Sequence, residues 1–212
     1  MFKPQMIVFD WNGTLIDDVW LSVNAINQLL EKRRKPLITI DHYKEIFDFP
    51  VKKYYTTLGL DTENEWNSLA NEFIASYLGD LEKIKLFQDV IETIGFLKMN
   101  GIETGIFSAM QHEGLNRHVK HLKIDHFFKF IQGTEDYYAE GKAHLGKKLL
   151  TDNGLKAENM LFVGDTVHDF EVSKEIGCKS VLVSRGHNSP QRLDSTGACV
   201  INSLGDLKKI IG

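Results

Sequence analysis

The sequence predicts an α/β fold in which a parallel sheet is interrupted, after its first strand, by a small all-helical insert. Three observations favour this fold. Short apolar runs recur along the chain, and helix-like segments separate the later runs. A stretch of roughly 60 residues after the first run shows no strong strand pattern. Strands that alternate with helices are typical of a parallel sheet with helices on both faces.

Six short apolar runs are the predicted strands, because their length and branched residues favour buried strands. They are Met6–Phe9, Thr104–Phe107, Phe130–Ile131, Met160–Val163, Ser180–Val183 and Ala198–Ile201. The predicted core helices, several of which end at a Gly or Asn stop signal, are Asp89–Met99, Gly114–Leu122, Ala143–Leu150, Phe170–Ile176 and Leu204–Ile211. We therefore expect a Rossmann-like parallel sheet.

The segment between the first two strands is predicted to be a helical cap. Val19–Glu31 carries apolar residues at helical spacing, and Asn64–Leu78 has the pattern of another helix. Between them, Asp41 is a candidate N-cap. We assign residues 1–16 and 82–212 to the α/β core and residues 17–81 to the cap.

The composition is that of an ordinary globular protein. Of the 212 residues, 42% are hydrophobic and 25% are charged, and the formal net charge is −4. A nucleic-acid binder would usually be basic, and no signal-peptide pattern or bilayer-length apolar run is visible. We expect a cytoplasmic monomer or homodimer with no nucleic-acid or membrane partner. Cys178 and Cys199 lie in apolar stretches, which predicts two buried free thiols.

Asp10 is the first candidate for chemistry. It follows the first predicted strand, and ligand sites of open α/β sheets gather at the carboxyl ends of strands. A carboxylate there can act as a nucleophile or a metal ligand. Gly13 lets the backbone approach an anion closely, and Thr14 offers a hydroxyl. An Asx turn after the strand is the purely structural alternative.

Further candidates follow later strands or begin a later helix. Ser108 follows the second predicted strand, and Lys142 precedes a helical run, where it would neutralise a phosphate. Asp165 and Asp169 follow Met160–Val163 and carry hard carboxylate oxygens that suit Mg²⁺. Each has a structural explanation when taken alone, as a turn residue, a solvated lysine or a helix-capping acid. Their order and placement favour a common site.

These elements resemble the signature of the haloacid dehalogenase superfamily, which is Asp-x-Asp-Gly-Thr, then Ser or Thr, then Lys, then Gly-Asp-x-x-x-Asp. The match runs from Asp10–Thr14 to Gly164–Asp169, and the helical insert is similar to that family's cap. The segment Ser184–Leu193 is similar to phosphoglycolate-phosphatase-like members. The resemblance implies an Mg²⁺-dependent phosphoric monoester hydrolase that acts on a small phosphorylated metabolite.

The resemblance also implies roles for individual residues. Asp10 would attack phosphorus and form an aspartyl-phosphate. The Mg²⁺ ion would be held by Asp10, the backbone carbonyl of Asn12, Asp165 and Asp169. The residues that would bind the phosphate are Gly13, Thr14, Ser108, Ala109 and Lys142.

Asn12 departs from the family pattern. Hydrolases of this family usually carry Asp at the equivalent position, where it protonates the leaving oxygen and then activates water. An amide donates a hydrogen bond, but it cannot give up or take a proton at neutral pH. General acid–base catalysis typically contributes about 10²–10⁴-fold. The loss matters most for alkyl phosphates and least for acyl or aryl phosphates, which leave as stable anions.

Three alternatives are open from the sequence. The first is a phosphatase with another proton donor, such as Asp17 or Asp18, or with substrates that need none. The second is a phosphonate hydrolase, because Asp10–Thr14 is similar to the Asp-Trp-Ala-Gly-Thr motif of such enzymes and Lys52 or Lys53 could form a Schiff base. The third is a phospho-ligand-binding or regulatory protein without catalysis. No motif in the cap identifies the substrate.

Overall fold

The computed structural model describes residues 2–135, 146, 150–152 and 154–211. Within these ranges a six-stranded sheet has the order β3-β2-β1-β4-β5-β6, and all neighbouring strands are parallel. The strands are β1 (Met6–Phe9), β2 (Glu103–Gln111), β3 (Ile131–Thr134), β4 (Met160–Gly164), β5 (Lys179–Val183) and β6 (Cys199–Ile201). The predicted α/β fold with a parallel sheet is confirmed. The predicted helix Ala143–Leu150 falls largely outside the described residues.

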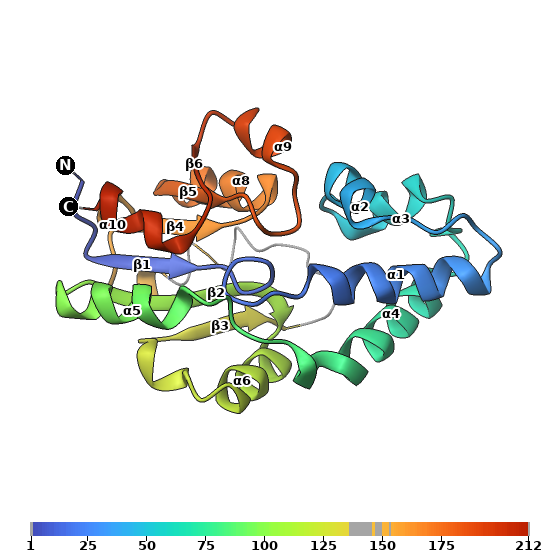
Figure 1. Ribbon diagram of the computed structural model, residues 1–212, viewed down its shortest axis with the longest axis horizontal. Coiled ribbons are helices and arrows are strands. Elements are labelled where there is room, and N and C mark those ends of the chain that lie inside the picture. The colour runs from blue at the N-terminus through green and yellow to red at the C-terminus, as the bar shows by residue number, and fades with distance from the viewer. Residues whose placement is uncertain (1, 136–145, 147–149, 153, 212) are drawn as a thin grey trace.

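Helices connect the strands and also form the insert after β1 (Figure 1). The α-helices are α1 (Val19–Lys32), α2 (Ile40–Ile46), α3 (Val51–Thr57), α4 (Trp66–Asp80), α5 (Val90–Met99), α6 (His112–His121), α8 (Val167–Ile176), α9 (Pro190–Asp194) and α10 (Leu207–Ile210). Short 3₁₀ turns occur at η1 (Leu81–Lys83), η2 (Asp125–Phe127), η3 (Ala157–Asn159) and η4 (Leu204–Asp206).

β1 lies inside the sheet and is buried on both faces. Ile7 and Phe9 belong to an apolar cluster that includes residues of α5, α6 and α10. Met6 and Val8 belong to a second cluster, which includes residues of α8 on the opposite face. Successive side chains of a strand point to opposite faces, so a wholly apolar run is what a central parallel strand requires.

The helices α1 to α4 lie beyond the carboxyl ends of the strands (Figure 1). Val19, Val23 and Ile26 of α1 recur at helical spacing and pack into an apolar cluster within the insert. Leu21 and Ala25 of the same helix belong instead to the cluster that packs against the sheet. α1 therefore connects the two apolar clusters, while the exact domain boundaries at residues 17 and 81 stay a prediction.

Two local predictions are wrong. α2 is capped by the hydroxyl of Thr39, which accepts from the backbone N–H of His42, and Asp41 lies inside the helix. Both cysteines are free, but Cys178 is half-buried and Cys199 is exposed, because β6 is a short strand at the edge of the sheet. No helix within the described ranges combines the length and apolar character needed to cross a membrane.

Candidate active site

Two carboxylates stand at the carboxyl ends of adjacent central strands. Asp10 directly follows β1, and its backbone N–H donates a 2.8 Å hydrogen bond to the carbonyl of Val163 in β4. Asp165 directly follows β4. Because β1 and β4 are parallel neighbours, their ends place both side chains in one place, as the sequence predicts.

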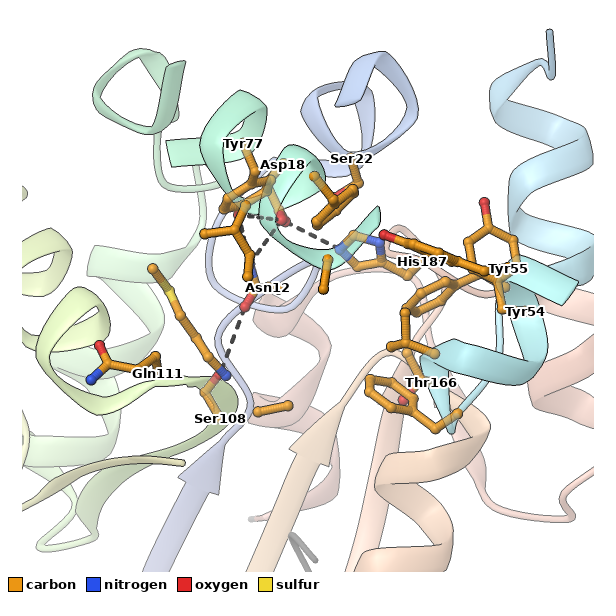
Figure 2. A pocket seen from close by; sticks show the side chains of 18 of the residues that line it. Asn12, Asp18, Ser22, Tyr54, Tyr55, Tyr77, Ser108, Gln111, Thr166 and His187 are labelled. Atoms are coloured by element: carbon orange, nitrogen blue, oxygen red, sulfur yellow. Dashed lines mark hydrogen bonds and ion pairs between the residues drawn. The ribbon is translucent and has the colours of Figure 1, made fainter. Parts of the chain in front are cut away.

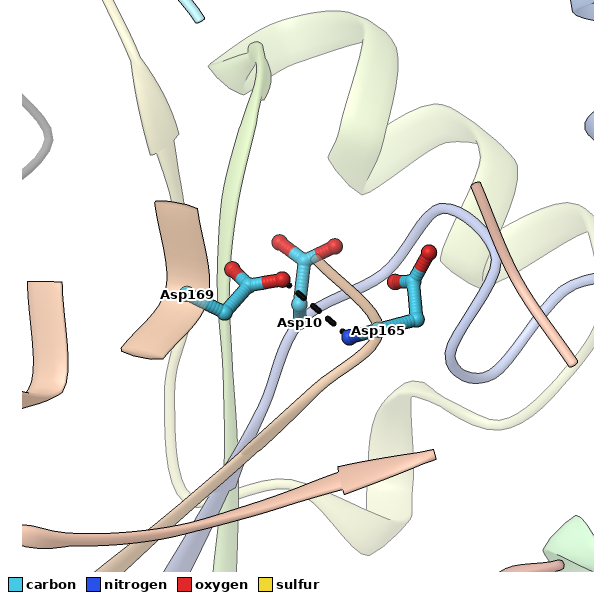
Figure 3. A group of neighbouring side chains, drawn as sticks. All are labelled: Asp10, Asp165 and Asp169. Atoms are coloured by element: carbon cyan, nitrogen blue, oxygen red, sulfur yellow. Dashed lines mark hydrogen bonds between the residues drawn. The ribbon is translucent and has the colours of Figure 1, made fainter. Parts of the chain in front are cut away.

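Asp169 completes this group from the first turn of α8. Carboxylate oxygens of Asp10, Asp165 and Asp169 lie within 4.8 Å of one another, and all three residues are buried (Figure 3). Such a set of hard oxygen donors fits Mg²⁺. The structure thus brings together the three carboxylates that the sequence predicts as metal ligands. The predicted contribution of the Asn12 carbonyl stays a prediction.

The same Asp169 also caps α8. Its Oδ2 accepts hydrogen bonds from the N–H of Asp165 at 3.1 Å, from the N–H of Thr166 at 3.0 Å and from the Thr166 hydroxyl at 2.7 Å. The Thr166 hydroxyl in turn accepts from the N–H of Asp169, which forms a capping box. The capping role and the place in the acidic group therefore coexist in one side chain.

Asp165 is held from two sides. The hydroxyl of Thr14 donates to its Oδ1 at 2.7 Å, and the backbone N–H of His187 donates to its Oδ2 at 2.6 Å. Burial is the main cause that raises the pKa of Asp165 to about 6, and repulsion from Asp169 adds to it against the opposing effect of His187. A cation between these carboxylates would favour the ionised form, which again fits a metal site.

Asp18 is the centre of a buried polar cluster that sequence reasoning described only in part. Its carboxylate accepts from the side-chain amide of Asn12 at 2.8 Å, from the hydroxyl of Tyr77 at 2.7 Å and from the N–H of Gly13 at 2.7 Å (Figure 2). It makes no side-chain hydrogen bond at the start of α1 and so does not cap that helix with its side chain. The carboxylate is 0% exposed, and its function is to hold Asn12 and Gly13 in place.

His187 is a functional candidate that sequence reasoning missed. Its Nε2 lies 3.3 Å from the carboxylate of Asp18, and its Nδ1 lies 2.8 Å from the hydroxyl of Tyr43. Burial alone would lower the pKa of His187, but attraction to Asp18, with smaller contributions from Asp165 and Asp10, raises it to about 9. Asp18 and His187 therefore form a buried ion pair. His187 lies in Ser184–Leu193, the segment that resembles phosphoglycolate-phosphatase-like members, and this resemblance was the signal that could have marked it.

The insert docks onto the core through the same segment after β5. The backbone N–H of Ser189 donates to the carbonyl of Lys44 at 3.1 Å, and the side-chain amide of Asn188 donates to the carbonyl of Phe47 at 2.9 Å. The ring of Phe49 stacks on His168 of α8, with the ring centroids 4.5 Å apart. These contacts hold the turn after α2 over the carboxylate group.

A cavity of about 210 Å³ opens between the carboxylate group and the insert. Asp10, Asn12 and Ser108 are among the residues that line its core end, and residues of α2, α3 and α4 line much of the side formed by the insert. Lys52 and Lys53 are exposed on α3 and border a different depression, so the structure offers neither to this cavity. A Schiff-base mechanism that relies on these lysines is therefore not supported.

The predicted phosphate-binding residues divide into several groups. Ser108 and Ala109 line the cavity, although Ser108 lies within the irregular carboxyl end of β2 and not after it. The hydroxyl of Thr14 and the N–H of Gly13 are directed to Asp165 and Asp18, and their contact with phosphate stays a prediction. Lys142 lies outside the described residues.

The guanidinium group of Arg185 is directed away from this site. It forms a 2.7 Å ion pair with Asp89 and donates a hydrogen bond to the backbone carbonyl of Thr14. It also lies over the ring of Phe87, with its central carbon 3.8 Å from the ring centroid. Arg185 therefore ties the loop after β1 to the start of α5.

The fold and the carboxylate group together define an α/β enzyme whose chemistry is placed at the carboxyl ends of β1 and β4. The family model described as haloacid dehalogenase-like hydrolase matches residues 7–183. The chain belongs to this family, as the signature Asp10–Thr14 and Gly164–Asp169 indicates.

Curated relatives and solved structures extend this result. The chain is 24% identical to the phosphoglycolate phosphatase of Pseudomonas putida, over 98% of this chain and 79% of that protein. It is 22% identical to the tyrosine-protein kinase PtkA of Mycobacterium tuberculosis, over 99% of this chain and 73% of that protein. A haloacid dehalogenase-like family hydrolase from Streptococcus pneumoniae has the same fold, with a TM-score of 0.86, 20% identity and coverage of 99% of both chains.

Proposed function

We propose that the protein is an Mg²⁺-dependent phosphatase that hydrolyses a small phosphate monoester through an aspartyl-phosphate on Asp10. The observation that carries this proposal is the meeting of Asp10, Asp165 and Asp169, with oxygens within 4.8 Å, at the end of a cavity in a haloacid dehalogenase-like hydrolase. The similarity to phosphoglycolate phosphatases supports the reaction class and does not identify the substrate.

Asp10 is suited to attack because its strand and its hydrogen bond to Val163 fix its position. A carboxylate oxygen of Asp10 forms a bond to phosphorus, and the bond from phosphorus to the leaving oxygen breaks with its electron pair on that oxygen. A water molecule then adds to phosphorus and loses a proton, the bond from phosphorus to Asp10 breaks, and inorganic phosphate and the Asp10 carboxylate result.

The negative charge of the site requires a cation before a phosphate can bind. Three buried carboxylates and a phosphate dianion repel one another strongly in a medium of low dielectric constant. Mg²⁺ held by Asp10, Asp165 and Asp169 would neutralise this charge and polarise the phosphoryl group. Other residues keep these carboxylates in place through hydrogen bonds. Thr14 and the His187 backbone hold Asp165, and Thr166 holds Asp169.

The test measures release of inorganic phosphate from acetyl phosphate and from 1-naphthyl phosphate, with and without Mg²⁺. Asp10→Asn should abolish release, because an amide is a poor nucleophile. Asp17→Asn is the matched control, since Asp17 is a nearby exposed carboxylate that does not line the cavity. Release that continues in Asp10→Asn, or that is independent of Mg²⁺, would contradict the proposal.

A binding readout separates the metal from the reaction. Mg²⁺ at about 100 times its dissociation constant should raise the free energy of unfolding by about 2.7 kcal/mol, and Asp165→Asn should remove most of this increase. Tight binding of 1-naphthyl phosphate without any turnover would instead favour a phospho-ligand-binding protein.

A further inference from the structure

The cavity beside Asp10 has walls of aromatic rings. The ring centroids of Phe47 and Tyr54 lie 5.3 Å apart, and those of Tyr55 and Phe73 lie 6.2 Å apart, in edge-to-face arrangements. All four rings line the cavity. An apolar cavity of about 150 Å³ holds benzene, so a volume of about 210 Å³ gives room for an aromatic group next to the carboxylates. Aromatic walls favour an apolar, flat occupant.

The charges around the cavity disfavour a second anionic group on the ligand. Among the described lining residues there is no lysine and no arginine. The imidazole of His187 is already paired with Asp18 and contacts the hydroxyl of Tyr43. Against this described part of the lining, a carboxylate on the ligand, such as that of glycolate, would lose its hydration without gaining a lysine or arginine partner, at a cost in free energy.

Tyr54 contributes its ring, and not its hydroxyl, to the wall. The residue lines the cavity, but its hydroxyl oxygen is buried and has no accessible surface. The wall at Tyr54 is therefore apolar, which favours an aromatic occupant.

The hydrogen bonds of Asn12, at the core end of the cavity, independently favour a ligand with an aromatic leaving group. The side-chain nitrogen of Asn12 donates to Asp18 at 2.8 Å and to the hydroxyl of Tyr77 at 2.7 Å, which uses both amide hydrogens. Asn12 therefore directs no donor to the leaving oxygen. A phenolic oxygen has a pKa of about 10 and leaves as a stable anion, whereas an alkoxide needs a proton.

We propose that the cavity binds the ring of an aryl phosphate monoester whose phosphorus lies at Asp10, and this assignment rests on the proposed phosphatase function. Asp10 bonds to phosphorus, and the bond from phosphorus to the aryl oxygen breaks. The aryloxide takes the electron pair and receives its proton from water. Small carboxylated phosphate esters are poor substrates.

The experiment compares kcat/KM of the full chain with Mg²⁺ for three substrates. These are 1-naphthyl phosphate, 2-phosphoglycolate, and acetyl phosphate, which combines a good leaving group with no ring. We expect kcat/KM for 1-naphthyl phosphate to exceed kcat/KM for 2-phosphoglycolate by about tenfold or more. Contacts of a few apolar atoms with a hydrophobic pocket can change kcat/KM by this factor. Equal or better turnover of 2-phosphoglycolate would overturn the assignment.

Two matched variants of α4 locate the ring. Ala70 lines the cavity, whereas Ala75 is exposed on the same helix and does not line it. Ala70→Phe should fill the cavity and lower the kcat/KM ratio of 1-naphthyl phosphate to acetyl phosphate by about tenfold. Ala75→Phe should leave the ratio within twofold. A ratio unchanged in a folded Ala70→Phe protein would overturn the assignment.

The outcomes separate this inference from the phosphatase proposal. If the protein turns over acetyl phosphate but does not prefer 1-naphthyl phosphate to 2-phosphoglycolate, the ring site is refuted and the phosphatase proposal still stands. Absence of turnover for every substrate would refute the phosphatase. Calorimetric binding of 1-naphthyl phosphate to the wild-type chain then decides the ring site. Binding that Ala70→Phe abolishes supports it, and absence of binding overturns it.

Discussion

The side-chain amide of Asn12 donates a 2.8 Å hydrogen bond to the carboxylate of Asp18, which is fully buried. Only an N–H donor can face this ionised carboxylate, so the orientation of the Asn12 amide is determined, with its oxygen directed toward Ser108. Position 12, where the family signature has Asp, therefore holds an amide that donates its hydrogen bond to Asp18. Five predictions follow from this arrangement and from the rest of the fold.

Asn12→Asp should restore a proton donor. Repulsion from the buried carboxylate of Asp18 favours the protonated form of the introduced carboxyl group, and its single proton can turn from Asp18 to a leaving alkoxide. We expect kcat/KM, which reports on phosphoryl transfer to Asp10, to rise roughly 10²-fold for 2-phenylethyl phosphate and to change far less for 1-naphthyl phosphate. Both esters carry a ring, so the comparison isolates the leaving group. Asn12→Ala is the control and should raise neither rate, and equal gains for both esters would contradict the account.

The wild-type chain should release its aryl product in a burst. The phosphoryl group transfers to Asp10 without an acid when the leaving group is an aryloxide, but Asn12 cannot activate water for the second step. In rapid-quench experiments, 1-naphthol should appear quickly in an amount close to that of the enzyme, followed by slow turnover. A linear time course from the first turnover would show that another group supplies the base.

Asp18 and His187 should be energetically coupled. Asp18→Asn keeps the shape of the side chain but leaves the buried His187 without its charge partner, and removal of one member of a buried pair costs about 3–5 kcal/mol. His187→Gln should be destabilising as well, and the double variant should cost at least about 1 kcal/mol less than the two single changes together. Urea unfolding at pH 7 measures all four proteins. Additive losses would mean that the pair contributes nothing as a pair.

Gly186 should be irreplaceable beside Asp165. A Cβ built on Gly186 collides with the carboxylate of Asp165, whereas a Cβ on Gly95, in the middle of α5, meets nothing within 4 Å. We expect Gly186→Ala to lower Mg²⁺ affinity at least about tenfold, as changes that disturb a metal ligand commonly do. Gly95→Ala should instead stabilise the protein by about 0.5–1 kcal/mol. Mg²⁺ titration calorimetry and thermal unfolding give the two readouts, and unchanged affinity in Gly186→Ala would contradict the packing.

His118 should make the fold sensitive to acid. The residue is 2% exposed against Trp11, with ring centroids 5.5 Å apart, and burial lowers the pKa of His118 from 6.5 to about 4. The unfolded chain therefore binds a proton between pH 6.5 and 4 that the folded chain excludes, so stability falls as the pH falls through this window. The contribution of His118 alone should be a loss of about 2 kcal/mol at pH 5 relative to pH 7, whereas the raised pKa values of Asp165 and His187 act in the opposite direction.

His118→Phe should remove this part of the pH dependence. The exposed His126 provides the control, because His126→Phe should leave the acid sensitivity in place. Urea midpoints at pH 7 and pH 5 for the three proteins measure the difference. An equal loss of stability at pH 5 in wild type and His118→Phe would assign the acid sensitivity to other groups.

The alternation of apolar strands and helices was sufficient to predict the sheet, because burial on both faces leaves an uninterrupted apolar run at β1 and β4. The carboxylates were predictable for the same reason, since parallel neighbours end at one edge and bring Asp10 and Asp165 together. The ends of elements were less predictable. β2 continues past Phe107 as an irregular strand, which the sequence pattern does not mark.

The polar cluster around Asp18 could be predicted only in part. Asp18 and Asn12 are close in sequence, and Asp18 was a natural candidate for a role near the nucleophile. Its partners Tyr77 and His187 come from α4 and from the loop after β5, and no sequence pattern links either of them to Asp18. Contacts of this kind depend on how the insert packs on the core, and the spacing of residues in the sequence does not predict this packing.

The pairing of Asp18 with His187 also sets the order in which the protein can mature during synthesis. The two residues are 169 positions apart, and Thr14 and its partner Asp165 are 151 positions apart. Asp10, Thr14 and Asp18 therefore leave the ribosome well before Asp165 and His187, with which they form the site. A nascent chain that stops before β5 carries the carboxylates of Asp10, Asp165 and Asp169 but lacks His187, so Asp18 and Asp165 each miss one partner until the segment after β5 has been made.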